Sequence, residues 1–204
     1  VDRIKTEIEL NKEDIIKTRR YLHENPEVSS KEFETSKYLK KRCEEIGLIV
    51  EEVPGSTGFT ALLDTGRPGK TLGIRTDLDG LAIEEDPYNL KGKKQVVSKN
   101  PGVSHACGHD SHMTIAIISA KILKDLADEI KGKIYFIFEE AEETGAGIGP
   151  MLDHLKDKGL DAVYGNHQSP SLDVGKFSIT EGPAYAGCAG LDFDVIGKGG
   201  HGSR

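Results

Sequence analysis

A six-residue run, "KIYFIF" at 133–138, stands between two stretches with helical character. Continuous apolar runs of this length are typical of strands buried on both faces, which need a layer of helices on each side. Apolar residues repeat at helical spacing from 109 to about 127, and another helix is expected at about 146–158. The run therefore predicts an α/β fold in which helices cover both faces of a sheet.

The rest of the chain continues this alternation of helices and strands. Apolar spacing predicts a helix over 12–24 with Asn11 as its N-cap, and Ser29 and Glu32 have the spacing of a capping box for the next helix. Cys43 falls on the apolar side of that second helix and is expected in the core. Gly and Pro clusters then separate short β-type runs. The expected strands are 48–53, 59–64, 71–77, 161–167, 175–180 and 191–199, and the expected linker is 182–190.

Composition excludes several classes of protein. The chain has 204 residues and a net charge of -7, and nucleic-acid binding needs clustered Lys and Arg instead. The one basic run, 90–95, is expected to be a solvated loop. No apolar stretch is long enough to span a bilayer, and the first ten residues carry charges where a signal peptide is apolar. Three scattered cysteines suit a reducing compartment, so we expect a cytoplasmic protein without a disulfide framework and with no nucleic-acid or membrane partner.

Chemically active side chains follow several of the expected strands. Asp77 and Asp79 end one strand, four glutamates (139, 140, 142 and 143) follow the apolar run, and His167 ends another strand. Ligand sites in open α/β sheets gather at the carboxyl ends of strands. These segments and the "HACGHD" stretch at 105–110 are therefore expected to meet at one edge of the sheet.

The "HACGHD" stretch permits three interpretations. Cys107 and His109 are two residues apart, so an extended loop places both side chains on one side. The pair could be a thiol nucleophile with its base, part of a metal site, or part of an ordinary helix start. Glu142 and Glu143 point in different directions, so one can bind a cation while the other takes a proton from water. Cys107, His109, Glu143 and His167 then provide four N, S and O donors, while H-E-x-x-H, Walker A and G-x-S-x-G patterns are absent.

Together these motifs resemble a known family. The resemblance runs through "RRYLHENPEVSSKEFET", "IRTDLDGLAIEE", "PGVSHACGHDSHM", "AEETGAG", "GNHQSP" and "GKGGHGSR", and so covers essentially the whole chain. The chain resembles the family of N-acyl-L-amino acid amidohydrolases, hippurate hydrolases and indoleacetyl-amino acid hydrolases. This family lies within the aminoacylase and carboxypeptidase metallopeptidase superfamily. It implies an enzyme that uses two divalent ions (Mn, Zn, Co or Ni) to hydrolyse small N-acyl amino acids.

The resemblance also implies roles for individual residues. Cys107 would be a bridging thiolate, His109, Glu143 and His167 would be further metal ligands, and Glu142 would be the general base and acid. Residues supporting the site would be Asp77, Asp79 and His112. His201, in the "GGH" motif, would reach the substrate across a homodimer or homotetramer.

The resemblance implies a three-layer, zinc-peptidase-like catalytic domain over residues 1–184, with residues 185–204 as the first strand of an inserted α+β lid or dimerisation domain. The chain is thus expected to be a fragment. One departure is Glu139–Glu140, where the family usually has Gln-Pro, which adds negative charge near the site. The alternatives are a metallo-dipeptidase or carboxypeptidase, an inactive metal-binding fragment, and a thiol hydrolase using Cys107.

Overall fold

The computed structural model describes every residue except 1, 184–192, 195, 199 and 201–204. Contacts divide the chain into two units, residues 1–168 and 169–204, and the first unit contains all the helices and strands that follow. The helices are α1 (Asp2–Leu10), α2 (Lys12–Glu24), α3 (Phe33–Ile46), α4 (His109–Asp125) and α5 (Ile148–Leu155), with short 3-10 turns η1 (Ala127–Glu129) and η2 (Glu142–Thr144). The strands are β1 (Ile49–Glu52), β2 (Phe59–Asp64), β3 (Thr71–Asp77), β4 (Tyr88–Asn89), β5 (Gly92–Lys93), β6 (Lys133–Glu139) and β7 (Ala162–Gly165).

A mixed five-stranded sheet forms the middle of the first unit. Its order is β1-β2-β6-β3-β7. The strands β6, β3 and β7 are parallel, whereas β2 pairs antiparallel with both of its neighbours, β1 and β6. In the β3–β6 register Asp77 lies opposite Glu139, the last residue of each strand. The parallel part of the sheet therefore brings its carboxyl ends, and the polar residues that follow them, to one edge.

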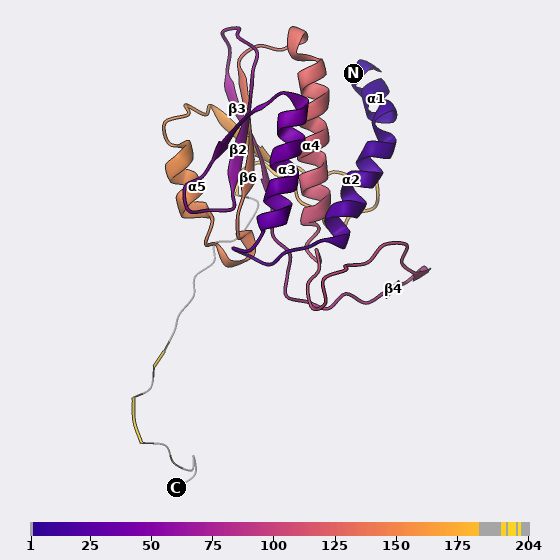
Figure 1. Cartoon of the computed structure of the whole chain (residues 1–204), viewed down its shortest axis with the longest axis vertical. Coiled ribbons are helices and arrows are strands. Elements are labelled where there is room, and N and C mark those ends of the chain that lie inside the picture. Colours follow the sequence, from indigo (N-terminus) through magenta and orange to yellow (C-terminus); the bar gives the residue numbers. More distant parts are fainter. Residues whose placement is uncertain (1, 184–192, 195, 199, 201–204) are drawn as a thin grey trace. The chain divides into compact units, whose positions relative to one another are not determined.

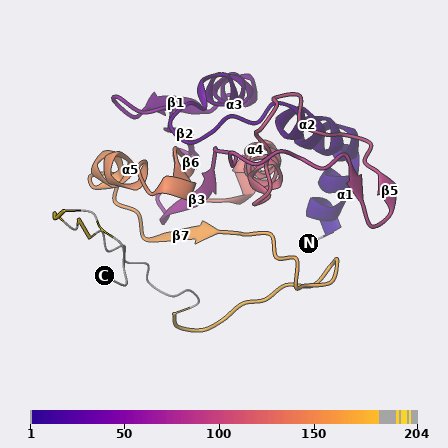
Figure 2. The same cartoon turned by 90° about the horizontal axis from the view of Figure 1, so that it is seen from below.

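Helices cover both faces of this sheet (Figure 1; Figure 2). On one face α2, α3 and α4 pack around a core that includes Phe136 and the stacked rings of Phe59 and Phe138, whose centroids are 4.3 Å apart. On the other face α5 contributes Met151 to a smaller cluster with Tyr135. This confirms the predicted helix–sheet–helix layers, and the fully buried pattern of β6 explains why its sequence is apolar without alternation.

Several local expectations need correction. The Ser29–Glu32 capping box is wrong, because both side chains are bound elsewhere in the fold. α3 begins at Phe33, and the carboxylate of Glu27 instead accepts the backbone N–H groups of Glu34 and Thr35. Asn11 precedes α2 as expected, but its amide donates to the carbonyl of Glu7 in α1, a helix that the sequence had not indicated. Cys43 is fully buried, as predicted.

The later expectations have mixed outcomes. The strand expected at 175–180 is absent from the structure. The basic run at 90–95 is largely exposed, as expected, but it lies in and beside the β4–β5 hairpin instead of a plain loop. The expected strand 191–199, the linker 182–190 and the 184/185 boundary fall mostly on residues outside those described, so they stay predictions. Across the described ranges, no helix has both the length and the apolar character needed to cross a bilayer.

Candidate metal centre

His109 is the centre of the polar cluster at the sheet edge. It is the first residue of α4, it is 1% exposed, and its Nδ1 donates to the backbone carbonyl of Asp79 at 2.7 Å. Its Nε2 is buried and has no hydrogen-bond partner among the described residues. That atom lies 3.6 Å from a carboxylate oxygen of Glu143 and 3.8 Å from one of Glu142. An unbonded imidazole nitrogen facing carboxylates is the arrangement that a shared cation would satisfy.

Asp79 fixes the two glutamates. Its carboxylate accepts the backbone N–H of Glu142 at 3.2 Å and that of Glu143 at 3.1 Å, and also the hydroxyl of Ser29 at 2.6 Å. Burial alone would raise the pKa of Asp79, but these bonds and the nearby His109 outweigh it and lower the pKa to about 2. Asp79 is therefore an ionised anchor that holds the turn carrying both glutamates.

Glu32 holds the same turn from the other side. Its buried carboxylate accepts the backbone N–H of Ala141 at 2.9 Å and the hydroxyl of Thr57 at 2.8 Å. Ala141 has φ of +51°, a left-handed conformation that is uncommon for a residue with a β-carbon. The bond to Glu32 helps hold this bend, which turns the chain from the end of β6 into η2.

Cys107 and His167 complete the cluster. The sulfur of Cys107 lies 3.3 Å from Nε2 of His167, which follows β7. Three combinations of side chains could hold a cation, each with its ligand atoms within 4.8 Å of one another, and all three include His109. They are Cys107–His109–His167, His109–Glu142–Glu143 and Asp77–His109–His112.

His112 connects the ends of two strands. Its Nδ1 donates to Asp77 at 2.9 Å, and its Nε2 accepts the backbone N–H of Gln168 at 2.9 Å, so this bonding pattern assigns a neutral imidazole. Arg75 donates to the other oxygen of Asp77 at 3.0 Å and to Glu139 at 2.7 Å. The extra acidic residue Glu139 is thus paired with Arg75 rather than with the cluster, and Glu140 bonds to Ser56.

The electrostatics of the cluster fit a cation better than a free thiol nucleophile. Burial and the carboxylates of Glu143 and Glu142 raise the pKa of Cys107 to about 12. Burial would lower the pKa of His109, but its bonds to Asp79 and the charge of Asp77 raise it to about 9. The thiol is thus protonated and bonded to His167 instead of His109, which removes support from the thiol-hydrolase hypothesis. Sulfur, imidazole and carboxylate donors together fit a divalent transition-metal ion.

The structure brings together almost all the residues expected at the site. Asp77, Asp79, Cys107, His109, His112, Glu142, Glu143 and His167 all contribute to the cluster, while His201 lies outside the described residues. Sequence reasoning missed the contributions of Ser29, Glu32, Arg75 and Gln168. Ser29 and Glu32 had a signal, but their spacing was interpreted as a helix cap.

Comparison with known proteins places this geometry in a family. The model of peptidase family M20/M25/M40 matches residues 73–198, which is more than half of the chain. The chain belongs to peptidase family M20/M25/M40. Among curated M20 relatives, an N-acyl-L-amino acid amidohydrolase of Geobacillus stearothermophilus is 37% identical over 99% of this chain and 54% of its own length. Thermostable carboxypeptidase 2 of Saccharolobus solfataricus is 38% identical over 100% of this chain and 51% of its own.

A solved M20 structure has the same fold. The YXEP protein of Bacillus subtilis, described as a dinuclear metal-binding peptidase, superposes with a TM-score of 0.76 and 38% identity. That match covers 83% of this chain and 47% of the YXEP chain. This M20 chain spans about half the length of the curated relatives it matches.

Proposed function

We propose that the protein is a metal-dependent amidohydrolase that splits the amide bond of an N-acyl amino acid into a carboxylic acid and a free amino acid. The observation that carries this proposal is the buried, unbonded Nε2 of His109, which faces Glu142 and Glu143 within a cluster of metal-binding side chains. Relatives named as amidohydrolases and deacetylases support the substrate class.

The cluster suits two divalent ions, of manganese, zinc, cobalt or nickel. Cys107, His109, Glu143 and His167 would be the ligands, with Cys107 between the two ions. Such ions would polarise an amide carbonyl and lower the pKa of water to about 7. Asp77, Asp79 and His112 would keep the ligands in place through the hydrogen bonds described above.

Glu142 would move the proton. Burial, the largest influence, raises its pKa, as do Asp77 and Glu143, although His109 and Arg75 act in the opposite direction. A carboxylate with a raised pKa can accept a proton from the attacking water and later return it. The water oxygen joins the acyl carbon, the C–N bond breaks, and Glu142 delivers the proton to the departing amine nitrogen.

The second candidate is a carboxypeptidase or dipeptidase, which the relatives named carboxypeptidase favour. Such an enzyme would use the same residues on a peptide instead of an N-acyl amino acid. A third possibility is that this chain binds metal without turnover. We further propose that the protein is cytoplasmic and forms a homodimer or homotetramer in which His201 contacts the partner's substrate.

The test compares this chain and a longer gene product on N-acetyl and N-benzoyl amino acids and on dipeptides. We expect a chelator to abolish hydrolysis, manganese, cobalt or zinc to restore it, and Glu142→Gln to retain metal but lose turnover. Glu140→Gln is the matched control, because Glu140 bonds to Ser56 outside the cluster. Unchanged turnover in metal-loaded Glu142→Gln would refute the assigned base, and faster cleavage of dipeptides would favour the peptidase.

A further inference from the structure

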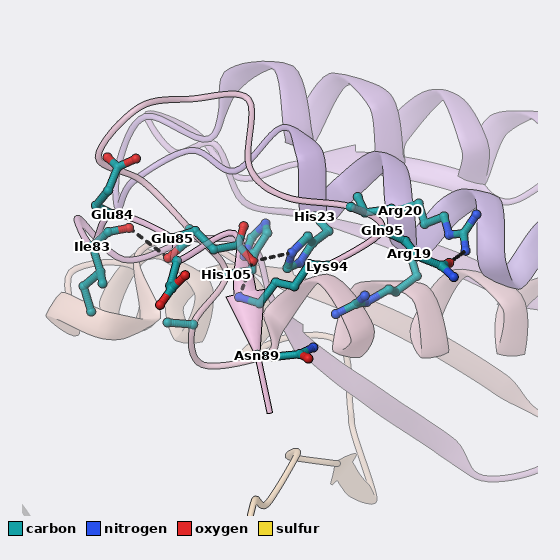
Figure 3. A pocket seen from close by; sticks show the side chains of 14 residues that line it. Arg19, Arg20, His23, Ile83, Glu84, Glu85, Asn89, Lys94, Gln95 and His105 are labelled. Atoms are coloured by element: carbon teal, nitrogen blue, oxygen red, sulfur yellow. Dashed lines mark hydrogen bonds and ion pairs between the residues drawn. The ribbon is translucent and has the colours of Figure 1, made fainter. Parts of the chain in front are cut away.

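A cavity lies between α2, the segment around the β4–β5 hairpin, and residues 104–106 (Figure 3). Its volume is about 520 Å³, within the range of small-molecule sites. None of the candidate metal ligands lines it, although His105 and Ala106 directly precede Cys107 in the chain. The cavity therefore needs its own explanation.

One end of the cavity is positively charged. Arg19 and Arg20 extend from α2 on the same side, as Figure 3 shows. Arg19 pairs with Asp110 through Nε at 3.0 Å, which leaves the outer edge of its guanidinium for another acceptor. Arg20 donates to the side-chain oxygen of Gln95 at 2.7 Å, and this neutral partner does not compensate its charge. Guanidinium groups bind carboxylates in a planar, two-pronged geometry, so this end suits a carboxylate.

The other end is acidic. Figure 3 shows Glu84 and Glu85 on the side of the cavity away from the two arginines. Glu85 is already paired with Lys94 at 2.9 Å and with His23 at 3.0 Å. Glu84 is exposed, and it bonds only to the backbone N–H of Gly102 within the described part of the chain. The carboxylate of Glu84 is thus held in place and available to an ammonium group.

His105 lies between these ends with unsatisfied polar atoms. Its side chain is 5% exposed, and neither ring nitrogen has a hydrogen-bond partner in the described structure. Buried polar groups are normally bonded, because leaving them unpaired costs folding free energy. A neutral imidazole offers one donor and one acceptor, which matches the C=O and N–H of a peptide unit. His23, its neighbour in the cavity wall, is already bonded at both nitrogens.

We propose that this cavity binds a short zwitterionic peptide, with its ammonium group at Glu84, its amide beside His105 and its carboxylate at Arg19 and Arg20. A single α-amino acid carries both charges on one carbon and cannot serve opposite ends of the cavity, whereas a dipeptide has an amide between them. An N-acyl amino acid lacks the ammonium group. The site is independent of the proposed function, because its lining residues exclude the metal ligands.

The test uses Gly-Gly and two probes that each lack one charge, N-acetyl-Gly-Gly and Gly-Gly amide. Each is titrated into the ¹⁵N-labelled chain in the presence of a chelator, so that binding through metal ions is removed. We expect Gly-Gly to shift the amide signals of Arg20, Gln95 and Ala106, and each modified probe to bind about tenfold more weakly, since each lost charge-assisted bond is worth about one decade of affinity.

Variants of two exposed residues identify the site. Arg20→Gln and Glu84→Gln should each weaken Gly-Gly binding about tenfold, while Lys17→Gln on the same helix should leave it unchanged. Circular dichroism confirms that each variant is folded. The proposal is overturned if Gly-Gly shifts only signals near Cys107 and His167, if the three probes bind equally, if neither variant weakens binding, or if about 20 mM Gly-Gly produces no shift.

Discussion

Replacing Asp79 by asparagine should weaken the hydrogen bonds that hold the turn carrying the candidate base, Glu142, next to the end of β3. The two side chains have nearly the same shape, but the carboxylate accepts bonds from three donors: the hydroxyl of Ser29 and the backbone N–H groups of Glu142 and Glu143. Asparagine would place its own N–H₂ group against at least one of these donors. Because the site is fully buried, water cannot replace the lost bond.

The expected cost is about 3 kcal/mol of unfolding free energy at pH 7, since hydrogen bonds to a charged group contribute roughly 1.5–3 kcal/mol each. The pKa of Asp79 is depressed to about 2 in the folded chain, so its stabilisation is complete above the unfolded pKa and is lost as pH falls through about 2. By this linkage about 1 kcal/mol of the stabilisation is already lost at pH 3. The difference between Asp79→Asn and the native chain should therefore shrink at low pH.

Urea unfolding at pH 7 and pH 3, with chelator present, measures both effects. Asp157→Asn provides the matched control, because Asp157 is exposed and its replacement should change stability by less than about 0.5 kcal/mol. If Asp79→Asn is as stable as the native chain at pH 7, Asp79 does not anchor the turn. A loss that is the same at both pH values would show that its carboxylate charge is not the reason.

Three further outcomes are expected. Because the pKa values of Cys107 and His109 are raised to about 12 and about 9, manganese binding at pH 7.5 should release about two protons. Calorimetry in buffers with different ionisation enthalpies measures this release, and no release would contradict metal ligation by Cys107 and His109. His112→Phe removes both bonds of the imidazole and should weaken metal binding about 10- to 100-fold in a competition titration, and native affinity would remove its supporting role. Phe136→Ala should cost about 3–5 kcal/mol in thermal or urea unfolding, whereas Phe177→Ala, 91% exposed, should be nearly neutral.

The fold class could be predicted because its signals are local. The apolar run of β6 and the helical spacing of α4 depend on residues close together in the chain. In each case the spacing of apolar residues follows from which sides of the strand or helix are buried. The meeting of Asp77, the glutamates and His167 followed from one general rule about the carboxyl ends of strands. The strand expected at 175–180 shows the limit of this reasoning, because β-type residues form a strand only where they can pack against a neighbouring strand.

The sequence by itself thus determined the order of the main helices and strands apart from α1 and the β4–β5 hairpin. It also determined core residues such as Cys43 and the edge of the sheet where reactive groups gather. Only the tertiary structure decided which groups are partners: Ser29 with Asp79, Glu32 with Ala141, and Cys107 with His167. The physical reason is that apolar periodicity within one helix or strand shows which of its residues face the core. A hydrogen bond between residues 50 or more positions apart depends instead on how whole helices, strands and loops pack together.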